Sequence, residues 1–118
     1  WMLGFSPFEN SAVQCHNPSI EEVNFYLKEY IVIDEIIDAW IVMKVDEIAW
    51  VYEWRDEAEK KMIENGFCGM SEEKVRDFVG LFMPAYKVYL ESLYKFGPNG
   101  AKEKPLLSIN IGKSRLPI

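Results

Sequence analysis

Helical periodicity governs the long central part of the chain. From residue 47 onward, apolar side chains recur every three or four positions, the spacing that places them on one face of a helix. The pattern predicts a helix over 47–64, a second helix that follows Ser71, and a third that runs to about residue 96. The positions expected to face inward are Ile48, Val51, Tyr52, Ala58 and Met62 in the first helix, Val75, Phe78, Val79 and Phe82 in the second, and Tyr86, Tyr89, Leu90, Leu93 and Phe96 in the third.

Local signals mark where these helices begin and end. Asn65 and Gly66 stop the first, because glycine readily takes the left-handed conformation that commonly follows a helix. The hydroxyl of Ser71 can cap the second by accepting a backbone N–H. Pro84 disfavours helical geometry at Met83, so we expect a kink or a fresh start there.

The pattern before residue 40 is more mixed. Residues 3–5 resemble the end of a strand, and the proline and asparagine residues of 6–18 predict a loop. Ser19 and Glu22 have the spacing of a capping box at a helix start. The helix after them should bury Val23, Tyr26, Leu27 and Tyr30. Residues 31–38 predict a second helical segment, because their isoleucines fit a helical stripe.

Two segments predict strands. Residues 40–45 are a short apolar run without alternation, which is typical of a strand covered on both faces in a parallel sheet. Residues 97–100 predict a turn. After it, apolar residues 107, 109 and 111 alternate with polar ones, as in a strand with one better-buried face. Strands separated by helices predict a helix-rich α/β arrangement, although two strands are too few for a complete sheet.

Composition narrows the class of partner. The 118 residues fit one domain, and 49% hydrophobic with 27% charged residues is ordinary globular composition. The net charge of −6 gives no general attraction to nucleic acid or anionic lipid, although a local cationic cluster can still bind phosphate. No apolar run is long enough to span a membrane. Cys15 and Cys68 lack metal-ligand spacing, and we expect reduced thiols inside a cell.

One short motif resembles the end of a phosphate-binding P-loop but lacks the rest of that motif. Gly112-Lys113-Ser114 ends like a P-loop, but that motif needs another glycine five residues before the glycine of G-K-S, and a helix after it. Leu107 stands where the earlier glycine belongs, and Pro117 leaves no helix whose amides would face phosphate. We therefore expect an exposed basic turn.

Longer motifs resemble a known family. They are W-R-x-x-A-E-x-x-M from Trp54, G-M-S-x-E-x-V-x-D-F-V from Gly69 and M-P-A-Y-x-x-Y-L from Met83, with further matches in residues 1–5 and 115–118. Together they resemble plant and fungal D-glycerate 3-kinases and their ATP-binding relatives. Those proteins are P-loop kinases related to uridine kinase and phosphoribulokinase.

The resemblance implies a parallel sheet flanked by helices, of which residues 1–118 form a single partial domain, the C-terminal half. A helical segment at about 47–70 corresponds to a lid over the nucleotide. It implies ATP and Mg²⁺ as cofactors, bound mainly by an N-terminal half, and transfer of phosphate from ATP to D-glycerate. This chain alone is then expected to be inactive, and no residue in it is assigned a catalytic role. No metal ligand is assigned either.

Two arginines are the candidate nucleotide-binding residues implied by the resemblance. The planar fork of Arg55 suits phosphate, but Arg55 also stands four residues before Glu59, the spacing of a surface ion pair. Asp56 follows it where family members usually carry a non-acidic residue. Arg115 matches a second family position, with an exposed terminal charge as the alternative.

Four residues near the amino terminus are the candidate substrate-binding set: Trp1, Met2, Gly4 and Phe5. They match the segment after the family's central strand, and core packing is the equal alternative. The tyrosines from 86 to 94 are expected to be core residues. Asp34, Glu35 and Asp38 are expected on a solvated helix face and not at a metal site.

Two alternatives to a glycerate kinase stay open. One is a related kinase that phosphorylates another small alcohol, and the other is a non-catalytic binding module derived from this half. The expected partner is a glycerate-like small molecule, with self-association of the chain through its incomplete sheet. The expected compartment is the cytoplasm, with the plastid as the alternative.

Overall fold

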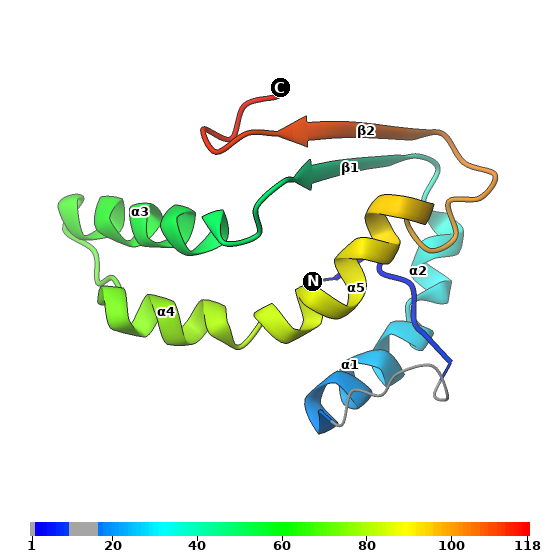
Figure 1. Cartoon of the computed structure of the whole chain (residues 1–118), viewed down its shortest axis with the longest axis horizontal. Coiled ribbons are helices and arrows are strands. Elements are labelled where there is room, and N and C mark those ends of the chain that lie inside the picture. Colours follow the sequence, from blue (N-terminus) through cyan, green and yellow to red (C-terminus); the bar gives the residue numbers. More distant parts are fainter. Residues whose placement is uncertain (1, 10–16) are drawn as a thin grey trace.

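The computed structural model describes residues 2–9 and 17–118, and in these residues it contains five helices and two strands (Figure 1). The helices are α1 (Pro18–Glu29), α2 (Ile31–Ile36), α3 (Trp50–Glu64), α4 (Glu72–Gly80) and α5 (Met83–Phe96). The strands are β1 (Trp40–Val45) and β2 (Leu106–Ile111). The predicted helix-rich α/β arrangement is confirmed.

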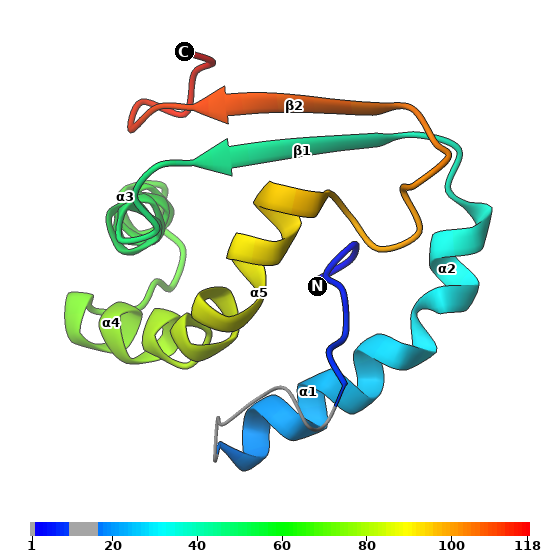
Figure 2. The ribbon, with the colours of Figure 1, turned by 45° about the vertical axis from the view of Figure 1, so that its right-hand side comes forward.

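The two strands form a parallel pair. Trp40 lies opposite Leu106, and the register continues to Val45 opposite Ile111. Between the strands the chain passes through α3, α4 and α5, which supplies the long crossover that parallel strands require. In both views of the ribbon β1 lies between β2 and the helices (Figures 1 and 2).

Only one face of β1 is covered. Trp40 and Val42 are buried, whereas Ile41 and Met43 are each 66% exposed. The prediction of a strand covered on both faces is wrong for the part of the chain that the structure describes. Alternate residues of a strand point to opposite faces, so an apolar face of the sheet is left open.

The main core joins the amino-terminal segment to α1 and α5. Its buried members are Met2, Phe5, Ile20, Leu27, Ala85 and Tyr89. The ring of Tyr89 lies between Phe5 and Phe8, at centroid distances of 5.8 and 5.6 Å. The buried side chain of Asn24 donates to the Phe8 carbonyl and accepts from the Phe8 N–H, both at 2.9 Å, and it also accepts from the Tyr89 hydroxyl. These contacts hold the amino-terminal segment against the helices.

The amino-terminal segment makes a turn where the sequence predicted a strand end. Leu3 and Gly4 form the turn, the N–H of Phe5 donates to the Met2 carbonyl at 3.1 Å, and Gly4 has φ +82°. Glycine takes this left-handed conformation without the steric cost that a side chain brings.

Most helix boundaries follow the sequence signals. Gly66, with φ +81°, follows the end of α3, and the Ser71 hydroxyl accepts the Lys74 N–H at the start of α4. A new helix begins at Met83, as Pro84 predicted. The predicted capping box at Ser19 is wrong, because the side chain of Asn17 caps α1 by accepting the Ser19 N–H at 3.0 Å.

Some residues predicted to face inward are exposed. They are Tyr26, Ala58, Met62, Phe78 and Phe96. Two of these lie on α3, whose main contacts with another helix or strand are with α4. The pair α3–α4 therefore projects as an arm, which Figure 1 shows to one side of α5. Within the described residues, no helix is long and apolar enough to cross a membrane.

Candidate functional site

Arg55 lies in the second turn of α3 and forms an ion pair with Glu59, one turn further on. The two side chains differ in environment: 41% of the Arg55 side chain is exposed, against 4% for Glu59. The expected ion pair is present, but it is not a surface bridge, because its carboxylate is buried. A buried carboxylate needs its partners, and its loss or theirs would leave a charge or a polar atom unpaired.

The second partner of Glu59 comes from the loop between α3 and α4. Its Oε2 accepts the backbone N–H of Met70 at 2.8 Å. The neighbouring Gly69 makes this approach possible, because a Cβ there would lie 2.9 Å from the Glu59 carbonyl and 2.8 Å from Ile63 Cγ1. One carboxylate thus holds an arginine with one oxygen and the interhelical loop with the other.

Arg55 also borders a cavity of about 280 Å³ between α3, α4 and α5. Its lining residues are Val51, Arg55, Phe78, Val79, Phe82 and Tyr86. The guanidinium carbon lies 5.2 Å from the centroid of the Phe78 ring, within cation–π range. Within the described residues the buried Nε atom of Arg55 has no hydrogen-bond partner. The site therefore offers an oriented guanidinium, the group suited to binding a phosphate or carboxylate.

Arg115 lies in the turn after β2 and contacts a different face of α3. It has φ +64°, pairs with Glu57, and places its guanidinium carbon 5.7 Å from the centroid of a Trp54 ring. The partner of Arg55 is Glu59 and the partner of Arg115 is Glu57. Residues two positions apart in a helix point about 200° apart, so these two carboxylates face different sides of α3. The structure does not bring Arg55 and Arg115 into contact with a common group.

Further contacts fix the turn after β2 to α3. The Lys113 ammonium lies 2.7 Å from a Glu53 carboxylate oxygen, and the Trp54 indole donates to the Lys113 carbonyl at 2.8 Å. Within the turn, the Gly112 N–H donates to the Leu116 carbonyl at 2.9 Å, and an isolated antiparallel bridge pairs Ile111 with Pro117 on either side of it. Residues 112–114 are therefore a turn without a following helix, as the sequence predicted.

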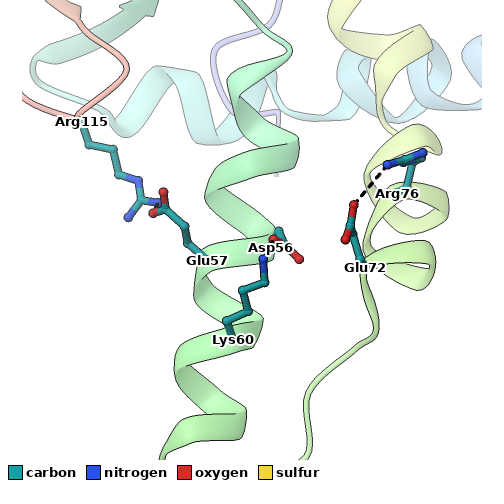
Figure 3. A network of polar contacts seen from close by, with 6 residues as sticks. All are labelled: Asp56, Glu57, Lys60, Glu72, Arg76 and Arg115. Atoms are coloured by element: carbon teal, nitrogen blue, oxygen red, sulfur yellow. Dashed lines mark hydrogen bonds and ion pairs between the residues drawn. The ribbon is translucent and has the colours of Figure 1, made fainter.

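Asp56, the acidic residue after Arg55, pairs with Lys60 at 2.6 Å and not with the arginine (Figure 3). The hydrogen bond to Asp56, with the charge of that carboxylate, raises the pKa of Lys60 above its ordinary value. Figure 3 shows this pair on α3, with Arg115 to one side and the Glu72–Arg76 pair of α4 to the other.

The candidate substrate-binding residues lie mostly in the core. Met2, Gly4 and Phe5 are buried, and Trp1 lies outside the described residues. A Cβ at Gly4 would lie 2.9 Å from Trp40 Cζ3, so the segment is tightly packed there. Met2 also lines a cavity of about 190 Å³ with residues of α1 and with Tyr30.

The acidic residues after α1 were predicted to be solvated, and for Asp34 this is wrong. Asp34 is 2% exposed, and its Oδ2 accepts from the Asn99 side chain at 2.8 Å. Lys104 donates to the carbonyls of Asp34 and Glu35, which joins α2 to the loop before β2. Glu35 and Asp38 are exposed, as expected.

Residues 2–9 and 17–118 contain no group of three or more His, Cys, Asp or Glu side chains placed to hold a metal ion. Cys68 is exposed, whereas Cys15 and His16 lie outside the described residues.

The sequence indicated Glu59 only as an ion-pair partner for Arg55. It did not predict the contact of Glu59 with the interhelical loop or the contact of the Phe78 ring with the Arg55 guanidinium. One sequence signal for the loop contact was available. Glycines at 66 and 69 allow the loop that follows α3 to turn back toward that helix, near the turn after Glu59. That signal is weak, because it does not say which side chain the loop reaches.

Comparison with known proteins identifies the family. No family profile matches the chain. The chain is 44% identical over 119 residues to the chloroplastic D-glycerate 3-kinase of Arabidopsis thaliana, an alignment covering 100% of this chain and 26% of that protein. It is 32% identical over 102 residues to the uncharacterized kinase mug58 of Schizosaccharomyces pombe, covering 79% and 37%. It is also 32% identical over 101 residues to the probable ATP-dependent kinase TDA10 of Saccharomyces cerevisiae, covering 80% and 35%.

Solved structures show the same fold. The structure titled YGR205w protein matches with a TM-score of 0.83 and 26% identity over 99% of this chain and 43% of that one. The D-glycerate 3-kinase of Cryptococcus neoformans matches with a TM-score of 0.78 and 24% identity, covering 100% and 46%.

The three sequence relatives and the Cryptococcus protein are named as kinases. The chain belongs to the D-glycerate 3-kinase-like kinase family, of which it covers a C-terminal portion. It spans about a quarter of the length of the Arabidopsis protein and between a third and a half of the other relatives.

Proposed function

We propose that these 118 residues are the C-terminal portion of an ATP-dependent D-glycerate 3-kinase, which transfers phosphate from ATP to D-glycerate. The observation that carries the proposal is the 44% identity, along the whole chain, to a protein named for that activity. The two yeast relatives, named only as kinases, are more distant at 32%. D-Glycerate is therefore favoured over another small alcohol as the acceptor.

The α3–α4 arm covers the nucleotide in this proposal. The α3–α4 arm acts as the lid, and Arg55 meets the phosphates, because its guanidinium is held by Glu59 and Phe78 at the edge of a cavity. Arg115 approaches the nucleotide from the turn after β2, where its ion-pair partner is Glu57. Both arginines stabilise charge through hydrogen bonds, and neither forms a covalent bond.

The amino-terminal residues support the acceptor pocket. Met2 and Phe5 direct their side chains into the core, so their proposed role is to fix the backbone beside the pocket and not to contact glycerate directly. Gly4 permits the close turn on which that backbone depends. Trp1 belongs to the same proposed set.

ATP and Mg²⁺ are held mainly outside these residues in this proposal. The 118 residues contain no G-x-x-x-x-G-K-[ST] motif, and the described acidic side chains form no cluster that fits a metal ion. When bound, Mg²⁺ neutralises charge on the transferring phosphate. The part played by this chain is to supply Arg55 from the lid and Arg115 from the turn after β2, each with its own contact to the nucleotide.

The test is an exchange chimera: the Arabidopsis D-glycerate 3-kinase in which this chain replaces the matching segment. We expect ADP release that depends on D-glycerate, because the exchanged segment retains the proposed lid and acceptor positions. Cooperative thermal melting is the control for folding. A folded chimera that releases ADP with a different small alcohol and not with D-glycerate would favour the related kinase. A folded chimera inactive with every acceptor would favour the binding module.

A further inference from the structure

Glu59 contacts two parts of the arm: Arg55 on α3 and the loop between α3 and α4. In the proposed lid these two parts must move together. One carboxylate oxygen pairs with the Arg55 guanidinium, and the other accepts the Met70 N–H at 2.8 Å. Since the carboxylate is only 4% exposed, water competes little for either contact. Arg55 is thereby fixed from one side by Glu59 and from another by the Phe78 ring.

We propose that Glu59 is a positioning residue that couples closure of the 66–70 loop to the orientation of Arg55. This inference rests on the proposed function for its effect on phosphate transfer, but the coupling itself is a property of the described contacts. When the loop lies against α3, the Met70 N–H occupies one oxygen and holds the carboxylate in the rotamer that reaches Arg55. When the loop moves away, that oxygen loses its donor, and Glu59 is free to rotate.

Gly69 allows the coupling to be tested without altering either partner. A Cβ at this position would lie 2.9 Å from the Glu59 carbonyl and 2.8 Å from Ile63 Cγ1, so Gly69→Ala should push the loop off the helix. Glu59 and Arg55 keep their own chemistry in this variant. Glu59→Gln is the complementary change, because it keeps an acceptor for Met70 and removes the charge that attracts Arg55.

The experiment reads the loop and the arginine separately, in the 118-residue chain and in the exchange chimera. Hydrogen exchange of the peptide that contains Met70 reports the loop. The rate at which phenylglyoxal modifies Arg55, followed by mass spectrometry, reports release of the guanidinium. Arg76, whose partner Glu72 is exposed, is an internal reference in every sample. The matched control variant is Glu57→Gln, which removes an exposed carboxylate two residues away.

We expect Gly69→Ala to speed exchange at Met70 and to raise the modification rate of Arg55 about tenfold, the ratio that corresponds to about 1.4 kcal/mol. Glu59→Gln should raise the Arg55 rate similarly with a smaller effect on Met70, and Glu57→Gln should change neither. If Gly69→Ala frees Met70 while Arg55 reacts at its original rate, the coupling is wrong. It is equally wrong if neither quantity changes.

Kinetics of the exchange chimera then test the consequence for the proposed reaction. Gly69→Ala and Glu59→Gln should each lower kcat about tenfold with little change in the KM for D-glycerate, and combining either with Arg55→Lys should add little. Full activity in both variants would overturn the positioning role. An inactive parent chimera would count against the proposed function alone, because exchange and modification rates still decide whether Glu59 couples the loop to Arg55.

Discussion

Arg115 and Glu57 form an ion pair that joins the turn after β2 to the face of α3 opposite the interhelical loop. Glu59 binds the loop before α4 within the arm, and Glu57 joins the arm to the turn at the end of the sheet. Because both carboxylates belong to α3, movement of this helix changes the surroundings of Arg55 and Arg115 together. A lid movement of α3 would therefore alter the contacts of both arginines, although the two carboxylates face different sides of the helix.

Replacing Arg115 should separate binding from stability. Both partners of the Glu57 pair are substantially exposed, so Arg115→Gln should change the free energy of unfolding by less than about 1 kcal/mol. In the exchange chimera the KM for ATP should rise about tenfold, because a charged hydrogen bond contributes about 1.5–3 kcal/mol. Lys113→Gln, which removes the neighbouring exposed pair with Glu53, is the control and should leave the KM for ATP nearly unchanged. Equal effects of the two variants would contradict the role of Arg115.

Arg55→Lys tests the lid arginine. Lysine keeps the charge that Glu59 needs but loses the planar fork, so kcat should fall or the KM for ATP should rise by tenfold or more in the exchange chimera, about 1.4 kcal/mol. The melting temperature should move little. Arg76→Lys on α4 is the matched control, since Arg76 pairs with Glu72 and both side chains are exposed. Unchanged kinetics in Arg55→Lys would leave the arginine with a structural role alone.

Much of the fold was predictable because its signals are local. Gly66 and Ser71 act through their own backbone conformation or hydroxyl, and Pro84 acts on its immediate neighbour, so each boundary appeared where the sequence placed it. The sequence predicted Ser19 as the cap of α1, whereas the cap is Asn17, two residues earlier; both residue types are good caps.

Burial of charged side chains was not predictable, because it depends on which distant segment packs there. Asp34 is buried by Asn99 and Gly100, about 65 residues away in the chain. Glu59 is buried by the loop that contains Met70, although its sequence position is that of an ordinary surface pair. Ile41 is the converse case. Its apolar side chain predicts burial, but the described residues leave it exposed.

Gly4 and Gly66 provide a matched pair for the packing of the amino-terminal turn. Both have φ near +80°, but a Cβ at Gly4 would lie 2.9 Å from the Trp40 ring and 3.0 Å from Pro98, whereas Gly66 has nothing within 4 Å. Gly66→Ala should cost about 1–2 kcal/mol for the left-handed backbone alone. Gly4→Ala adds a clash and should cost about 2–5 kcal/mol. The free energy of unfolding in urea measures both, and equal losses would contradict tight packing at Gly4.

The open face of the sheet should make the isolated chain associate or unfold in part. Ile41 and Met43 are each 66% exposed on β1, and Leu107 is 54% exposed on β2. Contiguous apolar surface of this kind promotes pairing with another chain. Analytical ultracentrifugation at micromolar concentration should therefore show oligomers or a broad distribution, and the double variant Ile41→Lys, Met43→Lys should shift it toward monomer. A monodisperse parent that melts cooperatively would favour an independently folded module.

The isolated chain should bind ATP no more tightly than millimolar and should not phosphorylate D-glycerate. Affinity in P-loop kinases depends mainly on consecutive backbone amides at a helix start and on a lysine beside them. Residues 112–114 do not supply this cradle: Gly112 is paired within its own turn, Lys113 is paired with Glu53, and no helix follows. Arg55 in water contributes about 1–2 kcal/mol, against the roughly 8 kcal/mol that micromolar binding requires. Calorimetric titration with Mg-ATP and a coupled ADP-release assay with D-glycerate measure the two quantities. Micromolar binding would reveal a phosphate site in these residues that neither the turn nor the arm accounts for.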